Sequence, residues 1–367
     1  MTEEAGLLQK REELKRQVSD GEYDTLVGKM FDKTGYLIQK LTRNPEPPPF
    51  WYSAVVIGLI VILIPFLTML VSGENPENTP HILNLRFFVF LRFSAVGMVI
   101  AALIAVRITA GMVRTTISDN LLESIESAAD LTDLQGWLVN FSDAKKPLFF
   151  SLGFVVLVSP YFIFVVLRGG FFYGIASVIF ALIVIFLLGL FLYYCFRMGV
   201  LPVRLSRYQF KLYTVDPSSS EVVDRLSDMG NTILYTMGGL AAISSLILAL
   251  LGLLTLDMII FLVIVAWIPL ISFFAIMQYT LAKIITRGKR KTLNEIQAQV
   301  ETLQTPENLV DEETMEAIKR LIDYHNLIKG TPNSAFNLRA GLNFLNSLLL
   351  PVLAFLLANL DTVLGLF

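Results

Sequence analysis

Charged side chains are scarce in this sequence. They make up 16% of the 367 residues, whereas hydrophobic residues make up 54%, and the mean hydropathy is +0.64. A soluble domain usually carries about a quarter charged residues, so the shortage excludes an ordinary water-exposed surface for much of the chain. The formal net charge is −2, so no overall positive field favours a nucleic-acid partner.

Cysteine and histidine are almost missing as well. The single cysteine, Cys195, excludes an internal disulfide framework and a zinc finger, and the two histidines, His81 and His325, are far apart in the sequence. The sequence also lacks a phosphate-binding loop, a dinucleotide-binding glycine motif, an HExxH pair and a nucleophile elbow. We therefore expect no metal site, no cofactor and no enzymatic activity.

Seven hydrophobic stretches are long enough to cross a bilayer, which requires about 20 apolar residues in a helix. Five of them contain no charged residue: residues 51–72, 147–167, 171–196, 233–254 and 258–282. A sixth, 85–108, contains three arginines, and a seventh, 340–366, contains several polar side chains. Because irregular backbone cannot face lipid, the predicted fold class is an all-α integral membrane protein with about seven transmembrane helices.

Basic residues are distributed unevenly around these stretches. Residues 1–49, 109–146, 198–230 and 284–339 hold 8, 3, 4 and 8 of them, which is 23 of the 29 present. The connections on the other side, 73–84, 169–170 and 255–257, hold none. Because basic loops stay in the cytoplasm, this asymmetry predicts a cytoplasmic N-terminus, an outer C-terminus and a multi-pass protein of the plasma membrane.

The same pattern divides the chain into four parts. Residues 1–49 are predicted to form cytoplasmic amphipathic helices, and 50–283 a six-span bundle with helical inner loops at 109–146 and 198–230. Residues 284–339 are predicted to form a cytoplasmic helical stalk and hairpin, because Leu293, Ile296, Val300 and Leu303 repeat at a 3-4-3 spacing. Residues 340–367 form the seventh span.

Two arginines of the second span are candidates for a charge at membrane depth. Arg92 and Arg107 are 15 residues apart, which is roughly 22 Å along a helix. Either Arg92 reaches the outer headgroups with its long side chain, or an arginine faces the bundle as an anion or ligand site. In the second case, acidic residues near the outer rim would balance it; they are Glu74, Glu77, Asp257 and Asp361.

Polar side chains also gather on the seventh span. Asn343, Asn346, Ser347, Asn359 and Thr362 occupy neighbouring helical positions and are not expected to face lipid. They either form hydrogen bonds between helices or line a water-filled pore or pocket. A basic cluster directly after the sixth span is predicted to contact anionic lipid; it consists of Arg287, Lys289, Arg290 and Lys291.

Two resemblances add to these patterns. The segments Lys211-Leu212-Tyr213…Asp216-Pro217 and Asn346-Ser347-Leu348-Leu349-Leu350-Pro351 look similar to segments of uncharacterised bacterial multi-span membrane proteins. The predicted topology resembles that of the insect gustatory and odorant receptors, which are tetrameric ligand-gated cation channels whose last helix lines the pore. This resemblance implies an oligomeric ion channel or channel-like sensor with the seventh helix near the conduction path.

Two other functions fit the same sequence. One is a non-conducting signalling or scaffold protein whose inner helices bind a cytoplasmic partner protein. The other is a secondary transporter, which usually has broken helices at matched positions in two halves. A homo-oligomer would favour the channel and a monomer the transporter, and the lipid bilayer is a partner in every case.

Overall fold

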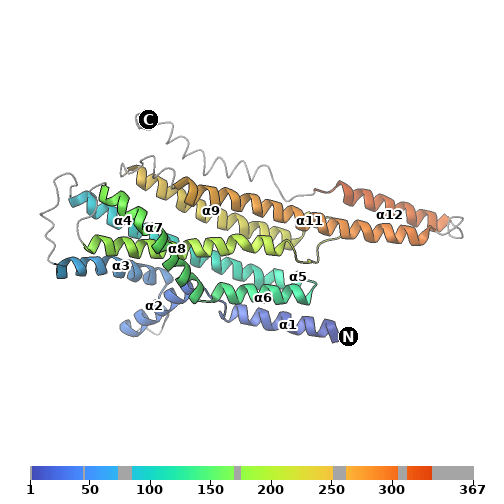
Figure 1. Cartoon of the computed structure of the whole chain (residues 1–367). Coiled ribbons are helices and arrows are strands. Elements are labelled where there is room, and N and C mark those ends of the chain that lie inside the picture. The colour runs from blue at the N-terminus through green and yellow to red at the C-terminus, as the bar shows by residue number, and fades with distance from the viewer. Residues whose placement is uncertain are drawn as a thin grey trace, which may run out of the picture.

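The computed structural model describes residues 2–43, 46–72, 85–168, 175–250, 262–304 and 312–332. These residues form a bundle of helices that lie largely side by side (Figure 1). No strand occurs within the described ranges, where Ile125 and Phe210 form an isolated antiparallel bridge. The prediction of an all-α fold is therefore confirmed for this part of the chain.

The described residues form the following elements in chain order. They are α1 (Thr2–Ser19), α2 (Leu26–Thr42), α3 (Phe50–Ser72), α4 (Leu85–Thr116), a π-helical turn (Ile117–Leu121), α5 (Leu122–Ser124), α6 (Ala128–Ser142), α7 (Lys145–Arg168), α8 (Ile175–Leu205), α9 (Glu221–Leu250), α11 (Ile268–Leu303) and α12 (Glu312–Gly330). A short 3-10 turn, Pro217–Ser219, precedes α9, and a second π-helical turn, Val263–Trp267, precedes α11.

Three segments of the described chain are long and apolar enough to cross a membrane: Phe93–Ser124, Val178–Leu205 and Ile268–Leu303. Residues Phe50–Ile64 form a shorter apolar helix. These segments overlap four of the predicted stretches, namely 85–108, 171–196, 258–282 and 51–72. The described residues therefore include three candidate membrane-spanning helices, and the predicted seventh span, 340–366, lies outside these residues.

The helices of the bundle carry apolar side chains both at their contacts with one another and on the outer surface of the bundle. Helix α8 packs against α3, α4 and α7, and α9 packs against α4 and α11. A Cβ at Gly189 of α8 would lie only 2.9 Å from the Cα of Ser151, so glycine allows α7 and α8 to approach closely. On the outer side of α7, Phe149, Val156 and Leu157 are largely exposed, which suits a surface in contact with lipid.

At one end of the bundle, α1, α5 and α6 form a helical layer that we call the base (residues 2–19 and 117–142; Figure 1). Its centre is fully buried, and Trp137 and Phe141 stack there with their ring centroids 4.8 Å apart. The chain enters the base without a break in the helix, because α4 continues through the π-helical turn into α5. The inner loop predicted at 109–146 therefore begins as an extension of the second span.

The second inner loop, predicted at 198–230, is also partly helical and is bonded to the first. Helix α8 continues to Leu205, and the backbone N–H of Lys211 then donates to the Ser124 carbonyl over 2.7 Å. The N–H of Glu126 donates in return to the Gln209 carbonyl over 2.9 Å. These bonds satisfy backbone groups in both loops, so the base and the loop after α8 form one layer.

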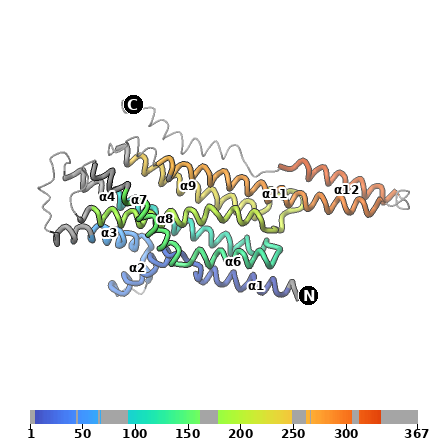
Figure 2. The backbone as a smooth tube through the Cα atoms, viewed as in Figure 1, coloured from blue at the N-terminus to red at the C-terminus, as the bar shows by residue number. Residues whose placement is uncertain are grey.

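The helical hairpin of α11 and α12 projects beyond the base at the same end of the molecule (Figures 1 and 2). Helix α11 has 36 residues, which corresponds to about 54 Å at 1.5 Å per residue. Ile296 of α11 and Ile318 and Ile328 of α12 are buried in the hairpin. The residues with the 3-4-3 spacing lie in the second half of α11, and α12 covers the apolar side of this part of the helix.

Candidate functional site

The first turn of α2 lies where the N-terminal segment (residues 2–43) contacts the bundle, and side chains from both parts hold it in place. The Thr25 hydroxyl accepts a hydrogen bond from the Gly28 N–H over 2.9 Å and so caps the helix. The Leu26 N–H donates to the Tyr194 hydroxyl of α8 over 2.8 Å. A Cβ at Gly28 would lie 2.3 Å from Asp24 Oδ1, so residue 28 must lack a side chain for Asp24 to fit.

Two ion pairs join this region to α4, and we call their four residues (Asp24, Asp32, Arg107 and Arg114) the α2–α4 ion-pair cluster. Asp24 Oδ1 lies 3.2 Å from Arg114 Nη2, and Asp32 Oδ1 lies 2.7 Å from Arg107 Nη2. Arg107 also donates to the Gly28 carbonyl over 3.1 Å and lies over the Phe31 ring. Because residues 107 and 114 are two helical turns apart, one face of α4 binds both aspartates.

The Asp24 carboxyl is the most buried member of the cluster, and burial raises its pKa above the usual value. The positive charge of Arg114 and the Thr25 N–H, which donates to Asp24 Oδ1 over 2.8 Å, oppose this rise. Loss of hydration therefore outweighs the two stabilising contacts of the carboxylate. The Asp24–Arg114 pair consequently holds the N-terminal segment in a defined position at a cost in solvation energy.

Arg107 is one of the two arginines that are candidates for a charge at membrane depth, and the structure shows its contacts. Its guanidinium bonds to the Asp32 carboxylate and the Gly28 carbonyl of α2. Arg92 lies in α4, in a part where the helix but not the side chain is described. Two groups of predicted residues lie outside the described ranges: Glu74, Glu77, Asp257 and Asp361 of the outer rim, and Asn343, Asn346, Ser347, Asn359 and Thr362 of the seventh span.

The predicted lipid-facing basic cluster is divided among different contacts. The Lys289 ammonium is buried and donates to the carbonyls of Lys329 and Thr331, at the C-terminal end of α12, over 2.9 and 2.7 Å. Arg287 donates to the Arg207 carbonyl, and Lys291 pairs with Glu126 over 2.8 Å. Arg287, Arg290 and Lys291 are exposed, so three of the four residues retain the surface position that a lipid contact requires, and Lys289 does not. Lys289 instead stabilises the negative end of a helix.

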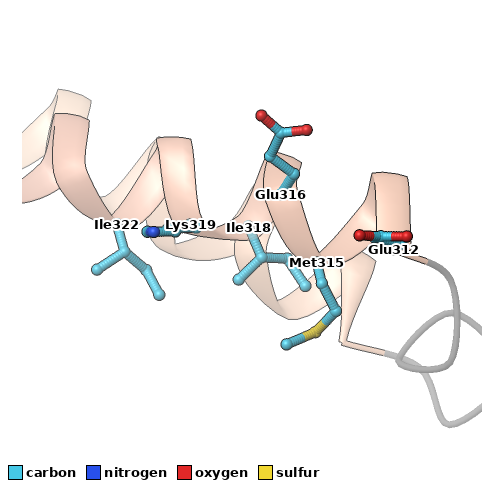
Figure 3. Close-up of a pocket in the computed structure, with 6 residues that line it drawn as sticks. All are labelled: Glu312, Met315, Glu316, Ile318, Lys319 and Ile322. Atoms are coloured by element: carbon cyan, nitrogen blue, oxygen red, sulfur yellow. The ribbon is translucent and has the colours of Figure 1, made fainter.

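A shallow hollow lies on α12 near the tip of the hairpin (Figure 3). Met315, Ile318 and Ile322 project from the same side of the helix, whereas Glu316 projects from the other side (Figure 3). Ile318 is only 5% exposed, but Met315 and Ile322 are 48% and 45% exposed. Part of the apolar stripe of α12 therefore extends beyond the area that α11 covers.

The tip of the hairpin is also strongly acidic. From Thr292 to Ile318 the sequence has seven acidic residues and no basic residue. Glu312 and Glu316 line the hollow itself together with Lys319, and Glu316 pairs with Arg320 over 2.7 Å. An apolar stripe that is surrounded by acidic side chains is complementary in charge and hydrophobicity to a basic amphipathic segment.

Sequence inspection did not detect the α2–α4 ion-pair cluster, because its acids and arginines are separated by about 80 residues. Two local signals were present: Asp24-Thr25 before an apolar helix is a cap pattern, and Gly28 stands within that helix. Neither signal identifies Arg114 as the partner of Asp24. The acidic tip of the hairpin could have been found by counting charges along residues 292–318.

Comparison with known protein families, with curated proteins and with solved structures gave no match. Within the described ranges, no three His, Cys, Asp or Glu side chains gather in a way that could hold a metal ion. The contacts of the described residues are therefore the basis for a functional proposal.

Proposed function

We propose that this protein is a membrane-embedded scaffold whose α11–α12 hairpin binds a cytoplasmic partner protein. The observation that carries the proposal is the hollow on α12, where half-exposed Met315 and Ile322 adjoin an acidic helix tip. Apolar side chains at this spacing give a partner helix buried area, and the surrounding carboxylates favour a basic partner.

The proposal includes a topology with seven spans, a cytoplasmic N-terminus and an outer C-terminus. The uneven distribution of basic residues supports it, together with the apolar helices of the bundle. In this orientation the base and the hairpin face the cytoplasm. The acidic tip would be repelled by an anionic leaflet, so the hairpin would extend from the membrane toward soluble proteins.

Site-specific photocrosslinking in living cells tests the scaffold proposal. A photoreactive amino acid at Ile322 should give discrete adducts with another protein, because this side chain lies in the hollow. The same amino acid at Ala298, which is exposed on α11, is the matched control and should give none of these adducts. Charge reversal of Glu312 and Glu313 to lysine should reduce the yield at Ile322 if the partner is basic.

Two results would contradict the scaffold proposal. One is an absence of adducts at Ile322 in cells that express the protein at its native level. The other is an equal set of adducts at Ile322 and Ala298, because random collisions do not distinguish the two sides of the hairpin.

A second candidate function is an oligomeric ion channel with the seventh helix near the conduction path, favoured by the polar side chains of residues 340–367. Replacement of Asn343, Asn346 and Ser347 by leucine would dry a water-filled lining and reduce conductance in planar bilayers. If these side chains instead bond neighbouring helices, the same changes would lower stability and leave any conductance intact.

A further inference from the structure

The apolar side of α2 is wider than the area that the protein covers. Val27 and Phe31 are buried against the bundle. Met30, Leu37 and Leu41 continue the apolar side around the helix at spacings of seven and four residues, and Leu37 and Leu41 are 57% and 83% exposed. In water, so large an exposed apolar surface on one helix would be unfavourable.

The position of α2 identifies the surface that these residues face. Helix α2 packs against α3, and a Cβ at Gly35 would lie 3.3 Å from Ser53 Oγ, in the first turns of α3. The exposed Trp51 and Tyr52 rings stack nearby with centroids 3.9 Å apart. Trp and Tyr concentrate at the boundary between lipid and water.

The apolar surface of α2 is continuous with that of the bundle. Beyond Trp51 and Tyr52, α3 exposes Val55, Leu59 and Leu63 at helical spacing, on the side suited to lipid. The second half of α2 lies beside the start of this surface, and the helix runs at an angle to α3 (Figure 1). A helix in such a position meets the headgroup layer rather than open water.

Basic side chains border the exposed apolar residues. Lys33 and Lys40 are exposed and seven residues apart, so they lie along the same side of α2, next to Leu37. Arg43, which caps the helix end, is exposed as well. Lysine side chains at the edge of an apolar helix face can extend their ammonium groups to lipid phosphates.

We infer that the second half of α2 lies in the headgroup layer of the membrane, with Leu37 and Leu41 in the lipid and Lys33 and Lys40 on anionic headgroups. The first half of the same helix carries Gly28 and Asp32, which contact Arg107 of α4. Helix α2 thus connects the lipid surface mechanically with the α2–α4 ion-pair cluster. This inference does not depend on a partner for the hairpin.

Fluorescence of a single label tests the inference. In a Cys195→Ser background, the variants Leu41→Cys and Leu8→Cys are labelled with an environment-sensitive dye and reconstituted into phosphatidylcholine nanodiscs with or without phosphatidylglycerol. Leu8 is an exposed apolar residue of α1 and serves as the matched control. The label at residue 41 should emit at shorter wavelength than the label at residue 8, and spin-labelled lipid should quench it several-fold more strongly.

The charge contribution is tested in the same nanodiscs. Lipid quenching at residue 41 should increase when phosphatidylglycerol is present, and the double change Lys33→Gln and Lys40→Gln should abolish this increase.

A label at residue 41 that aqueous iodide quenches as strongly as the label at residue 8 would show that α2 faces water, and the inference would be wrong. Protection from both quenchers would also overturn it, because a second copy or another protein would then cover the helix. Equal quenching in both nanodiscs would overturn the assignment of anionic lipid.

Discussion

At the scale of single residues, the Asp24–Arg114 pair is the more buried of the two ion pairs that join residues 24–32 to α4. The Asp24 and Arg114 side chains are only 11% and 22% exposed, so the charge left by removal of either partner has little access to water. Arg114→Met should therefore lower the free energy of unfolding by about 3 kcal/mol, because it leaves a buried carboxylate without its cation.

The exposed pair of Arg225 with Glu221 provides the control for this prediction. Their charged atoms are 3.9 Å apart, and more than half of each side chain is exposed. Arg225→Met should change the free energy of unfolding by about 0.5 kcal/mol or less. Thermal unfolding in detergent compares the variants, and an equal effect of both changes would mean that burial does not strengthen the Asp24–Arg114 contact.

The pKa of Asp24 predicts the pH dependence of the same contact. Burial raises this pKa above 3.8 in the folded protein, so the folded state binds the proton more tightly than the unfolded state. The contribution of Asp24 to stability is therefore largest in acid and decreases as the pH rises from 3.8 through the raised pKa. The difference in melting temperature between the wild-type protein and Asp24→Asn isolates this group. The melting temperature of the wild-type protein minus that of Asp24→Asn should fall as the pH rises over this range. A rise of this quantity with pH would contradict the prediction.

At the scale of elements, the helices were predictable from apolar runs, but their ends were not. The membrane-crossing part of the sixth helix was predicted to end at residue 282 and a helical stalk to follow it, and α11 continues to Leu303 with Ile296 buried beside α12. The predicted fourth span ended at residue 196, whereas α8 continues to Leu205 with Met198 and Leu201 buried. Membrane thickness limits the length of a span, but α8 and α11 continue beyond that length because their further turns bury apolar side chains against other parts of the protein.

The hairpin depends on Ile296, which is 5% exposed between α11 and α12. Ile296→Asp should separate the two helices, because an unpaired carboxylate cannot be solvated in this apolar contact. Trypsin should then cleave after Lys319 or Arg320 faster than in the wild-type protein, and crosslinking at Ile322 should be lost. Ala298→Asp places the same charge on the exposed side of α11 and should leave the cleavage rate unchanged. Slow cleavage of both variants would show that Ile296 does not hold the hairpin together.

Charge contacts between elements were less predictable than the elements themselves. Consecutive basic residues suggested one lipid-facing cluster, but a helix directs residues 287, 289 and 291 to different neighbours. Lys289 could not be recognised as a buried residue, because the carbonyls that accept its hydrogen bonds lie about 40 residues further along the chain. Tertiary packing determines such partners, and the spacing of residues along the sequence carries no information about it.

At the scale of the whole molecule, we propose that the bundle, the base and the hairpin have separate tasks. In this proposal the bundle with α3, α4, α8 and α11 is embedded in the membrane, and α2 lies along the cytoplasmic surface of the membrane. The base connects the inner ends of the helices, since α1 packs on α6 and Lys15 of α1 bonds to Glu123 of α5 over 2.9 Å. In the proposed topology the hairpin presents the hollow on α12 to the cytoplasm. Every one of these assignments requires the base and the hairpin to lie on the cytoplasmic side.

Thiol labelling of sealed cells tests this requirement most directly. In a Cys195→Ser background, single cysteines are placed at Glu77, in the connection without basic residues, and at Arg290, an exposed residue of α11. Arg290 is preferable to Lys289, whose buried ammonium bonds to α12. A membrane-impermeant maleimide should label residue 77 in sealed cells and residue 290 only after permeabilisation. Labelling of residue 290 in sealed cells would place the hairpin outside and contradict the account.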